Sequence, residues 1–160
     1  LILPLPKPKD VSGPRIVLFR WNNCDPDVSS LVDISKVYFM VLDILMVEDD
    51  NSTISGKAVL GDFRNFSVNY ILQFTPSHLK KSMTCMQSAY PIRIKGMYVT
   101  YAPIVFEKVF SFIKGLMPEK IRNRMFLYSE NNSNKVYKHI PKSYLPKEEG
   151  GDNGSIPDLT

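Results

Sequence analysis

The chain is poor in the residues and motifs on which most enzyme sites depend. It holds two histidines, His78 and His139, and contains no GxSxG, GxGxxG or P-loop sequence. Histidine is the side chain whose unperturbed pKa lies closest to neutral pH, and the three motifs mark nucleophile elbows, dinucleotide sites and phosphate sites. Because His78 is predicted on the first turn of a helix and His139 near a helix end, solvated or structural roles are expected for both. The sequence therefore predicts a protein that is not an enzyme.

Cysteine is equally scarce. Cys24 and Cys85 lie far apart and form neither a disulfide framework nor a CxxC metal motif, so free thiols in a reducing compartment are predicted. The acidic run at Glu48, Asp49 and Asp50 has no histidine or spaced ligand beside it and is predicted to begin a solvated loop. We therefore expect no metal and no cofactor.

Long apolar runs are also missing, since no stretch approaches the roughly 18–20 residues that span a bilayer. With 44% hydrophobic and 22% charged residues among 160, the composition is typical of one domain with a substantial core. The formal charge of +4 makes the chain mildly basic. That balance is compatible with phospholipid headgroups or nucleic acid and selects neither.

The pattern of apolar residues predicts alternating strands and helices. A helix beginning near Ser29 or Ser30 and ending at Glu48 carries apolar residues at helical spacing, including Ile34, Tyr38 and Val41. Because it separates two apolar strands, a right-handed crossover between parallel strands is expected. The predicted strands are 15–21, 56–62, 92–101 and 125–129, and the further helices are 76–89, 103–115 and 131–139. Residues 66–74 are predicted to form a short helix or a turn. The prolines of residues 1–14 predict an extended linker.

The stretch from Tyr90 to Arg124 is the most informative. Period-2 geometry places Ile92 and Ile94 on one face of a strand and two cations on the other. The helix that follows Pro103 is apolar over most of its circumference. Five cations flank this helix, namely Arg93, Lys95, Lys120, Arg122 and Arg124. Nucleic acid is not the expected partner, because these cations flank an apolar helix rather than an aromatic stacking platform.

Several segments, in order, resemble the CRAL-TRIO lipid-binding domain family, particularly its insect group similar to α-tocopherol transfer protein and cellular retinaldehyde-binding protein. They are LPLPKPKDVSGPRIVLFRW, GDFRNFSVNYILQFTPSHLKK, SAYPIRIKGMYV, PIVFEKVFSFIKGLMPEKIRNR and SYLPKEEGGDNGS. The resemblance implies an α/β fold, with a mostly parallel sheet flanked by helices and an interior lipid cavity closed by a mobile gate helix. It implies a lipid-binding domain over residues 15–150, a linker at 1–14 from a missing upstream helical module, and a C-terminal tail at 151–160.

The resemblance also implies which residues form the site. The gate would be Pro103 to Gly115, and the basic positions Arg93, Lys95, Lys120, Arg122 and Arg124 would meet phosphoinositide headgroups. The predicted ligand contacts are Tyr38, Leu42, Leu60, Phe66, Met83, Met86, Tyr90, Ile92, Ile94, Phe106, Val109, Phe112 and Ile113.

Four positions depart from the family pattern. Tyr38 and Leu42 stand where tocopherol-transfer members present small hydroxyls, so a bulkier pocket without those donors is expected. Tyr101 or Ala102 replaces the asparagine before the proline of the gate. Glu149 occupies the aromatic position of the terminal LPxEYGG pattern.

Two functions remain open at this point. The first is a carrier that binds a retinoid, tocopherol-like or other isoprenoid lipid and transfers it between membranes, with phosphoinositide contact opening the gate. The second is a phosphoinositide-sensing scaffold domain with a vestigial cavity. Either is expected to be a cytoplasmic monomer that associates reversibly with a membrane.

Overall fold

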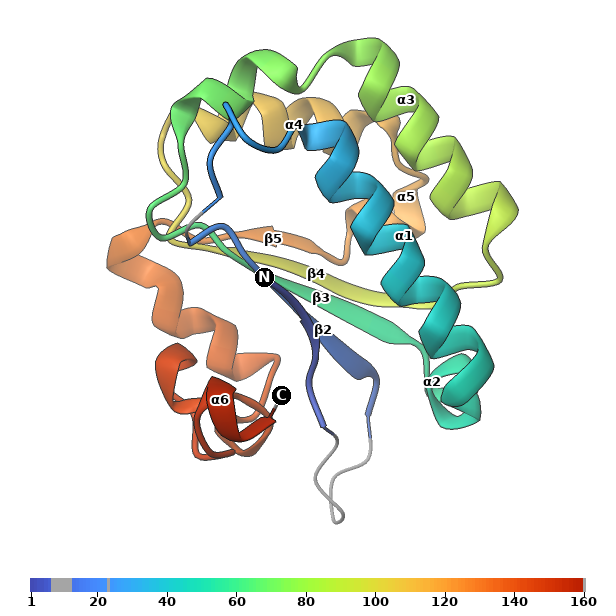
Figure 1. Cartoon of the computed structure of the whole chain (residues 1–160), viewed down its shortest axis with the longest axis vertical. Helices are drawn as coiled ribbons and strands as arrows, with labels where there is room; N and C mark the ends of the chain where they lie inside the picture. The colour runs from blue at the N-terminus through green and yellow to red at the C-terminus, as the bar shows by residue number, and fades with distance from the viewer. Residues whose placement is uncertain (7–12, 23, 160) are drawn as a thin grey trace.

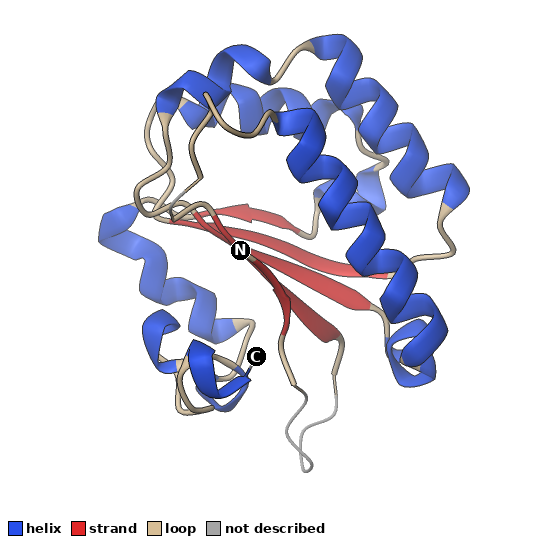
Figure 2. Ribbon diagram, in the orientation of Figure 1, coloured by secondary structure: helices blue, strands red, loops and turns tan. Residues whose placement is uncertain are grey.

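A single five-stranded sheet forms the centre of the computed structural model, which describes residues 1–6, 13–22 and 24–159. The strands lie in sequential order, β1 pairing antiparallel with β2 and all later pairs being parallel. Figure 2 shows this sheet between two layers of helices. The strands are β1 (Ile2–Pro4), β2 (Arg15–Arg20), β3 (Lys57–Asp62), β4 (Ile94–Thr100) and β5 (Met125–Leu127). The predicted α/β fold with a mostly parallel sheet is confirmed.

The strand order explains why the two faces of the sheet are covered differently. Parallel strands that follow one another in one direction, joined by right-handed crossovers, place all their connecting helices on the same face. In Figure 1 these helices lie above the sheet and the C-terminal segment lies below it. The upper layer comprises α1 (Leu31–Glu48), α2 (Asp50–Ser55), η1 (Val68–Gln73), α3 (Pro76–Thr84), η2 (Cys85–Ala89), α4 (Phe106–Leu116) and α5 (Glu119–Arg122). The lower layer comprises η3 (Glu130–Lys138), η4 (Lys142–Tyr144), η5 (Lys147–Glu149) and α6 (Ile156–Leu159).

The two long upper helices begin at well-formed caps. The Ser30 hydroxyl accepts a hydrogen bond from the Asp33 amide, and the Asp33 carboxylate accepts one from the Ser30 amide, which together form a capping box. The Thr75 hydroxyl caps α3 by accepting a hydrogen bond from the His78 amide, and Pro76 occupies the first helical position, where no amide hydrogen is needed. Both starts agree with the sequence prediction.

Each face of the sheet has its own hydrophobic core. The upper core packs α1, α3 and α4 onto the strands around Trp21, Phe63, Tyr70 and Phe106. The lower core packs the C-terminal segment onto the opposite face and includes Ile16, Leu60, Tyr98, Ile140 and Leu145. Alternation along the strands sends neighbouring residues to different cores.

Three segments differ from the sequence prediction. Residues 2–4 form edge strand β1 rather than a linker, because Leu3 and Leu5 are buried in the lower core; residues 7–12 of that prediction lie outside the described residues. Residues 50–55 form helix α2 rather than a loop. The tail forms α6, since Ile156 is buried and its amide donates to the Glu148 carboxylate.

Candidate functional site

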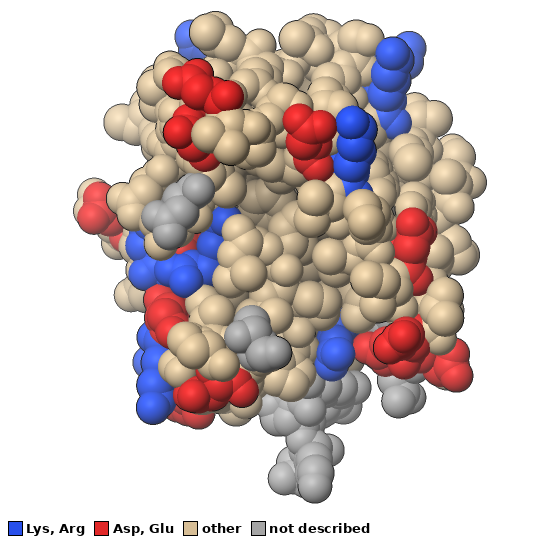
Figure 3. Space-filling view, in the orientation of Figure 1, with Lys and Arg blue, Asp and Glu red and all other residues tan. Residues whose placement is uncertain are grey.

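A cavity of about 210 Å³ lies between the sheet and the helices above it. β2, β3 and β4 form its floor, and α1, α3 and the start of α4 form its roof. The space-filling view shows few charges over the middle of this face and a hollow beside the first turns of α1 (Figure 3). The lining residues are Phe19, Trp21, Leu31, Ile34, Ser35, Tyr38, Phe39, Val59, Gly61, Phe63, Phe74, Ser82, Met83, Met86, Met97, Tyr98, Val99 and Phe106. Nearly all present hydrocarbon, so the space suits an apolar molecule.

Aromatic packing limits the size of the cavity. Phe106 lies 4.5 Å from Phe63 between ring centroids, and Trp21 lies 4.9 Å from Phe66 in an edge-to-face arrangement. These rings occupy the space next to the start of α4. The remaining volume is below the roughly 300–1,000 Å³ of sites for drug-sized ligands. The cavity is therefore small for a ligand of that size.

Four of the predicted ligand contacts line the cavity: Tyr38, Met83, Met86 and Phe106. Three other predicted contacts belong to the upper core but do not line the cavity, namely Phe66, Val109 and Ile113. Leu42 is fully buried and does not line the cavity either. Whether the four residues contact a ligand stays a prediction.

The other predicted contacts point elsewhere. Leu60 lies in the lower core, because its neighbours Val59 and Gly61 take the positions that face the helices. Phe112 is 43% exposed on the outer side of α4. Tyr90 stacks on Phe39 at 5.4 Å, and Ile92 and Ile94 lie near the start of β4, outside the lining.

The sequence reasoning missed most of the floor. Val59 with Gly61, and Met97 with Val99, stand two residues apart on parallel neighbours β3 and β4 and face the same side. The predicted parallel pairing together with period 2 groups these four residues on one face of the sheet, but it does not show which face carries the cavity. The roof residues Ser35 and Ser82 were also missed, and they supply hydroxyls that the resemblance did not predict.

Two of the five predicted cations flank the start of β4, where Arg93 donates to the Ile54 carbonyl of α2, and three lie on or just after α5, which packs against β4. We call the five residues the basic cluster: Arg93, Lys95, Lys120, Arg122 and Arg124. The Arg122 side chain donates to the carbonyls of Lys114 and Met117 at 3.2 and 3.1 Å, at the C-terminal end of α4. Arg124 donates to the Ile94 carbonyl. Lys95 and Lys120 are exposed. Arg122 and Arg124 therefore hold α5 against α4 and β4. The charges of Lys95 and Lys120 are accessible from solvent.

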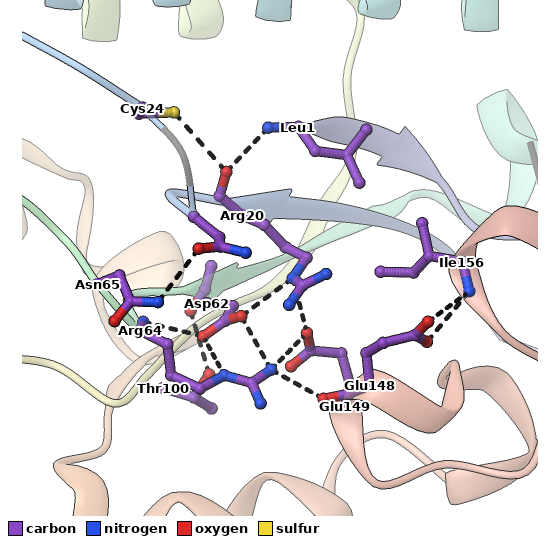
Figure 4. Close-up of polar contacts among 12 residues, drawn as sticks. Leu1, Arg20, Cys24, Asp62, Arg64, Asn65, Thr100, Glu148, Glu149 and Ile156 are labelled. Carbon is purple, nitrogen blue, oxygen red and sulfur yellow. Dashed lines mark hydrogen bonds and ion pairs between the residues drawn. The ribbon is translucent and has the colours of Figure 1, made fainter.

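A second group of charges lies where β2, β3 and the C-terminal segment meet (Figure 4). Arg20 and Asp62 end neighbouring strands in register. Asp62, with no exposed surface, accepts from Arg20 Nε at 3.1 Å and from Arg64 Nε at 2.9 Å. Glu149 approaches from η5 and lies 2.7 Å from the second guanidinium and 3.2 Å from the first. We call these four residues the charge network.

The charge network joins the ends of β2 and β3 to η5 through hydrogen bonds and ion pairs. The gap beside it, lined by Tyr101 and Glu149 among others, measures about 10 Å³, no more than about the space of one water molecule. Among the described residues, no group of three or more His, Cys, Asp or Glu side chains is placed to hold a metal ion. The sequence reasoning missed the network because Asp62 and Glu149 are far apart in the chain.

The pKa values of the two carboxylates in the charge network are shifted in opposite directions. Burial and the neighbouring Asp62 carboxylate raise the pKa of Glu149 to about 8. Burial also opposes ionisation of Asp62, but its hydrogen bonds from Arg64 and Arg20 prevail and hold its pKa below the ordinary value. The pair therefore keeps one proton near neutral pH, and Glu149 holds it.

This raised pKa makes stability fall as pH rises. The contribution of Glu149 is complete below its ordinary pKa of 4.5 and is lost as pH rises through about 8, because the unfolded chain releases the proton first. We expect Glu149→Gln to flatten the decline of unfolding free energy between these pH values, which reaches up to about 1.4 kcal/mol per pH unit in the native chain. Urea unfolding across the pH range measures this slope.

Glu148→Gln is the matched control, because its carboxylate caps α6 outside the charge network. It should leave the slope unchanged. Equal slopes in the native chain and Glu149→Gln would contradict the assignment of the proton to Glu149. Asp62 does not contribute to this slope. Because its pKa is lowered from the ordinary value of 3.8, it affects stability only below this pH range.

Comparison with known proteins agrees with this architecture. The sequence matches the CRAL/TRIO domain over residues 2–151. The human protein named alpha-tocopherol transfer protein-like is 30% identical over 151 residues, which cover 94% of this chain and 44% of that protein. Clavesin-1 of Rattus norvegicus is 32% identical over 143 residues, covering 89% of this chain and 40% of that protein. This chain thus spans less than half the length of these relatives.

A solved structure shares the fold. The crystal structure of Sfh5 superposes with a TM-score of 0.70 over 99% of this chain and 57% of that one, at 14% sequence identity. No helix in the described residues is both long and apolar enough to cross a membrane. The sequence match over nearly the whole chain, on a fold with an apolar cavity beneath its helices, shows that this chain belongs to the CRAL/TRIO domain family of lipid-binding and lipid-transfer proteins.

Proposed function

We propose that the chain binds a neutral hydrophobic small molecule, such as a retinoid, tocopherol-like or other isoprenoid lipid, and transfers it between membranes. The observation that carries this proposal is the apolar cavity between β2, β3, β4 and the roof helices. Clustered apolar walls with a few polar groups are typical of small-molecule sites. No catalytic step is part of the proposal, because the strongly shifted carboxylates are paired within the charge network.

Helix α4 is the part of the roof that we propose to move. Its first residues follow Tyr101, whose backbone is left-handed at φ 54°, and Ile104 beside them is 81% exposed. Moving α4 into water would expose Phe106, Phe110 and Ile113, which are buried, at about 5–9 kcal/mol in total. Membrane hydrocarbon removes most of this penalty, so opening is favoured at a bilayer.

The positive charge of the basic cluster favours contact between α4 and an anionic bilayer. Arg122 donates to the carbonyls at the C-terminal end of α4, so this member of the basic cluster is held at that end of the helix. Attraction to an anionic leaflet is worth about 1 kcal/mol per cation near the surface. That strength suits the reversible docking of a carrier at phosphoinositides.

Lipid uptake tests the proposal directly, and Trp21 is a built-in reporter because it is the single tryptophan and lines the cavity. Incubation with a panel of retinoids, tocopherols and other isoprenoids should change Trp21 fluorescence and add a ligand mass in native mass spectrometry. Val59→Trp, which fills the cavity from the middle of β3, should abolish the added mass. Because that change adds a second indole, the mass readout decides for this variant.

Val47→Trp adds the same side chain on the outside of α1, where Val47 is 82% exposed, and should keep uptake. An empty protein across the whole panel would overturn the carrier function. In that case the alternative, a phosphoinositide-sensing scaffold, is favoured by the small cavity volume of about 210 Å³.

A further inference from the structure

A second cavity lies on the opposite side of the sheet, within the lower core, where the C-terminal segment packs against the strands (Figure 1). Its volume is about 190 Å³, close to the 210 Å³ of the cavity above the sheet. Residues just before β2, the strands β2, β3 and β4, and the chain from the end of η3 to η4 line it. Apart from Tyr98, the two cavities share no lining residue among those described.

A small residue on β3 leaves this space open. Ala58 lines the cavity and is in register with Ile16 on β2 and Gly96 on β4. The ring of Tyr98 lies against Gly96, where any Cβ atom would collide with it. The space over the single methyl group of Ala58 is therefore left unfilled. The next side chain of β3, that of Val59, lines the upper cavity instead, because neighbouring residues of a strand face opposite sides.

Tyr144 brings an unpaired hydroxyl to this cavity. The residue is 3% exposed, and its Oη atom is buried without a hydrogen-bond partner among the described residues. The hydroxyl lies beside Gly13, another lining residue, since a Cβ atom placed on Gly13 would stand 3.4 Å from Tyr144 Oη. Burial raises the pKa of Tyr144 against the opposing charge of Arg15, so the phenol keeps its hydrogen at neutral pH. A buried hydroxyl without a partner is unfavourable, and a polar atom of a ligand would remove that penalty.

The cavity is polar without being charged. Among the described residues, no Asp, Glu, Lys or Arg side chain lines it. Arg15, at the start of β2, pairs with Asp49, whose carboxylate lies 3.3 Å from the Arg15 Nε atom. The polar side-chain groups in the lining are the hydroxyls of Tyr98 and Tyr144 and the ring of His139. Because burying a charge without a counter-ion is far more costly than burying a neutral polar group, the lining favours an uncharged ligand.

Two aromatic rings of the lining are stacked on each other. The ring centroids of Tyr98 and His139 lie 5.1 Å apart, at an interplanar angle of 28°. Aromatic surfaces favour offset-stacked or edge-to-face contact with another ring. A flat ring is therefore the shape that these walls favour. His139 and Pro141 are the exposed residues of the lining, so a ligand is expected to enter on their side.

We propose that the lower cavity is a second binding site, which takes a small neutral ring compound, such as a phenol, whose polar group pairs with the Tyr144 hydroxyl. An apolar cavity of about 150 Å³ accommodates benzene, so a volume of about 190 Å³ suits one substituted ring. Because the sheet separates the two cavities, this site is independent of the lipid carrier function proposed above.

Fluorine NMR titration with three probes of similar size tests the site: 4-fluorophenol, fluorobenzene and 4-fluorobenzoate. In the native chain, 4-fluorophenol should bind roughly fivefold more tightly than fluorobenzene, the effect of about one hydrogen bond, and 4-fluorobenzoate should bind most weakly. Tyr144→Phe removes the hydroxyl and keeps the ring, so it should bring the phenol-to-benzene ratio close to one at unchanged fluorobenzene affinity. Its midpoint of thermal unfolding should not fall, because the hydroxyl has no described partner to lose.

Ala58→Leu and Val59→Trp form a matched pair, because these neighbouring residues line opposite cavities. Ala58→Leu fills the lower cavity and should abolish the preference for 4-fluorophenol, whereas Val59→Trp fills the upper cavity and should preserve it. The site is overturned if the native chain binds no probe, which would mean that the cavity holds solvent only, if 4-fluorobenzoate binds best, or if Tyr144→Phe leaves the preference unchanged. The carrier function is decided separately, by lipid uptake at the cavity that Trp21 lines.

Discussion

Replacing Asp62 with alanine is expected to lower the free energy of unfolding by about 3–5 kcal/mol, the usual penalty for breaking a buried ion pair by removing one partner. The Asp62 carboxylate is fully buried and accepts from two guanidinium groups and from the Arg64 amide. Without it, two arginines share the single carboxyl of Glu149, whose proton must then leave. Urea unfolding at pH 7 measures the loss.

Asp152→Ala is the matched control, because Asp152 is exposed on the same lower side of the sheet. Exposed substitutions usually change stability by no more than about 0.5 kcal/mol. Equal losses for the two variants would contradict the role of the charge network. Should the alanine variant fail to fold, Asp62→Asn preserves the shape, and its loss should still exceed that of Asp152→Ala.

Charge reversal of Lys95 and Lys120 is expected to reduce binding to phosphoinositide-containing vesicles by roughly a thousandfold at low salt. The double change alters the net charge of the basic cluster by four units, at about 1 kcal/mol per unit near an anionic leaflet. These two lysines are the right targets, because Arg122 and Arg124 also hold backbone carbonyls and their loss would disturb α5. Vesicle co-sedimentation measures the change.

Lys135→Glu with Lys138→Glu provides the control, since both residues are exposed on η3 below the sheet. The same net charge change there should affect docking several fold at most. Equal loss in the two double variants would mean that only net charge matters and that the basic cluster is not the docking surface. Because both changes leave the cavity untouched, lipid uptake in the absence of vesicles should persist in both.

The sequence predicted the order and type of elements well because their local signals are strong. Ser30 and Thr75 cap helices whose apolar spacing is clear, and β2 is a compact run of β-branched and aromatic residues. Local signals did not predict the orientation of a residue where both faces of its strand or helix are apolar. Leu60 lies in the uninterrupted apolar part of β3, where both faces are buried and alternation carries no information. Phe112 lies on a helix that is apolar nearly all round, so spacing alone does not show which face is buried.

The site was harder to predict than the fold because its parts come from distant segments. The charge network joins the ends of β2 and β3 to η5, and the contact between Ser35 and His78 joins α1 to α3. Glu149 was recognised only as a departure from the aromatic in a family pattern. Its partners became visible once the strand order placed Arg20 beside Asp62.

The C-terminal segment covers one face of the sheet, and this affects how the chain folds while it is being synthesised. The helices above the sheet lie between the strands in sequence and can pack as each strand emerges from the ribosome. The lower core has to wait for Ile140, Tyr144 and Leu145, which follow all five strands in the sequence. Until then Ile16, Leu18 and Leu60 present an apolar strip, the kind of surface that chaperones recognise and that drives aggregation. The nascent chain is therefore most vulnerable just before the segment that completes the charge network is released.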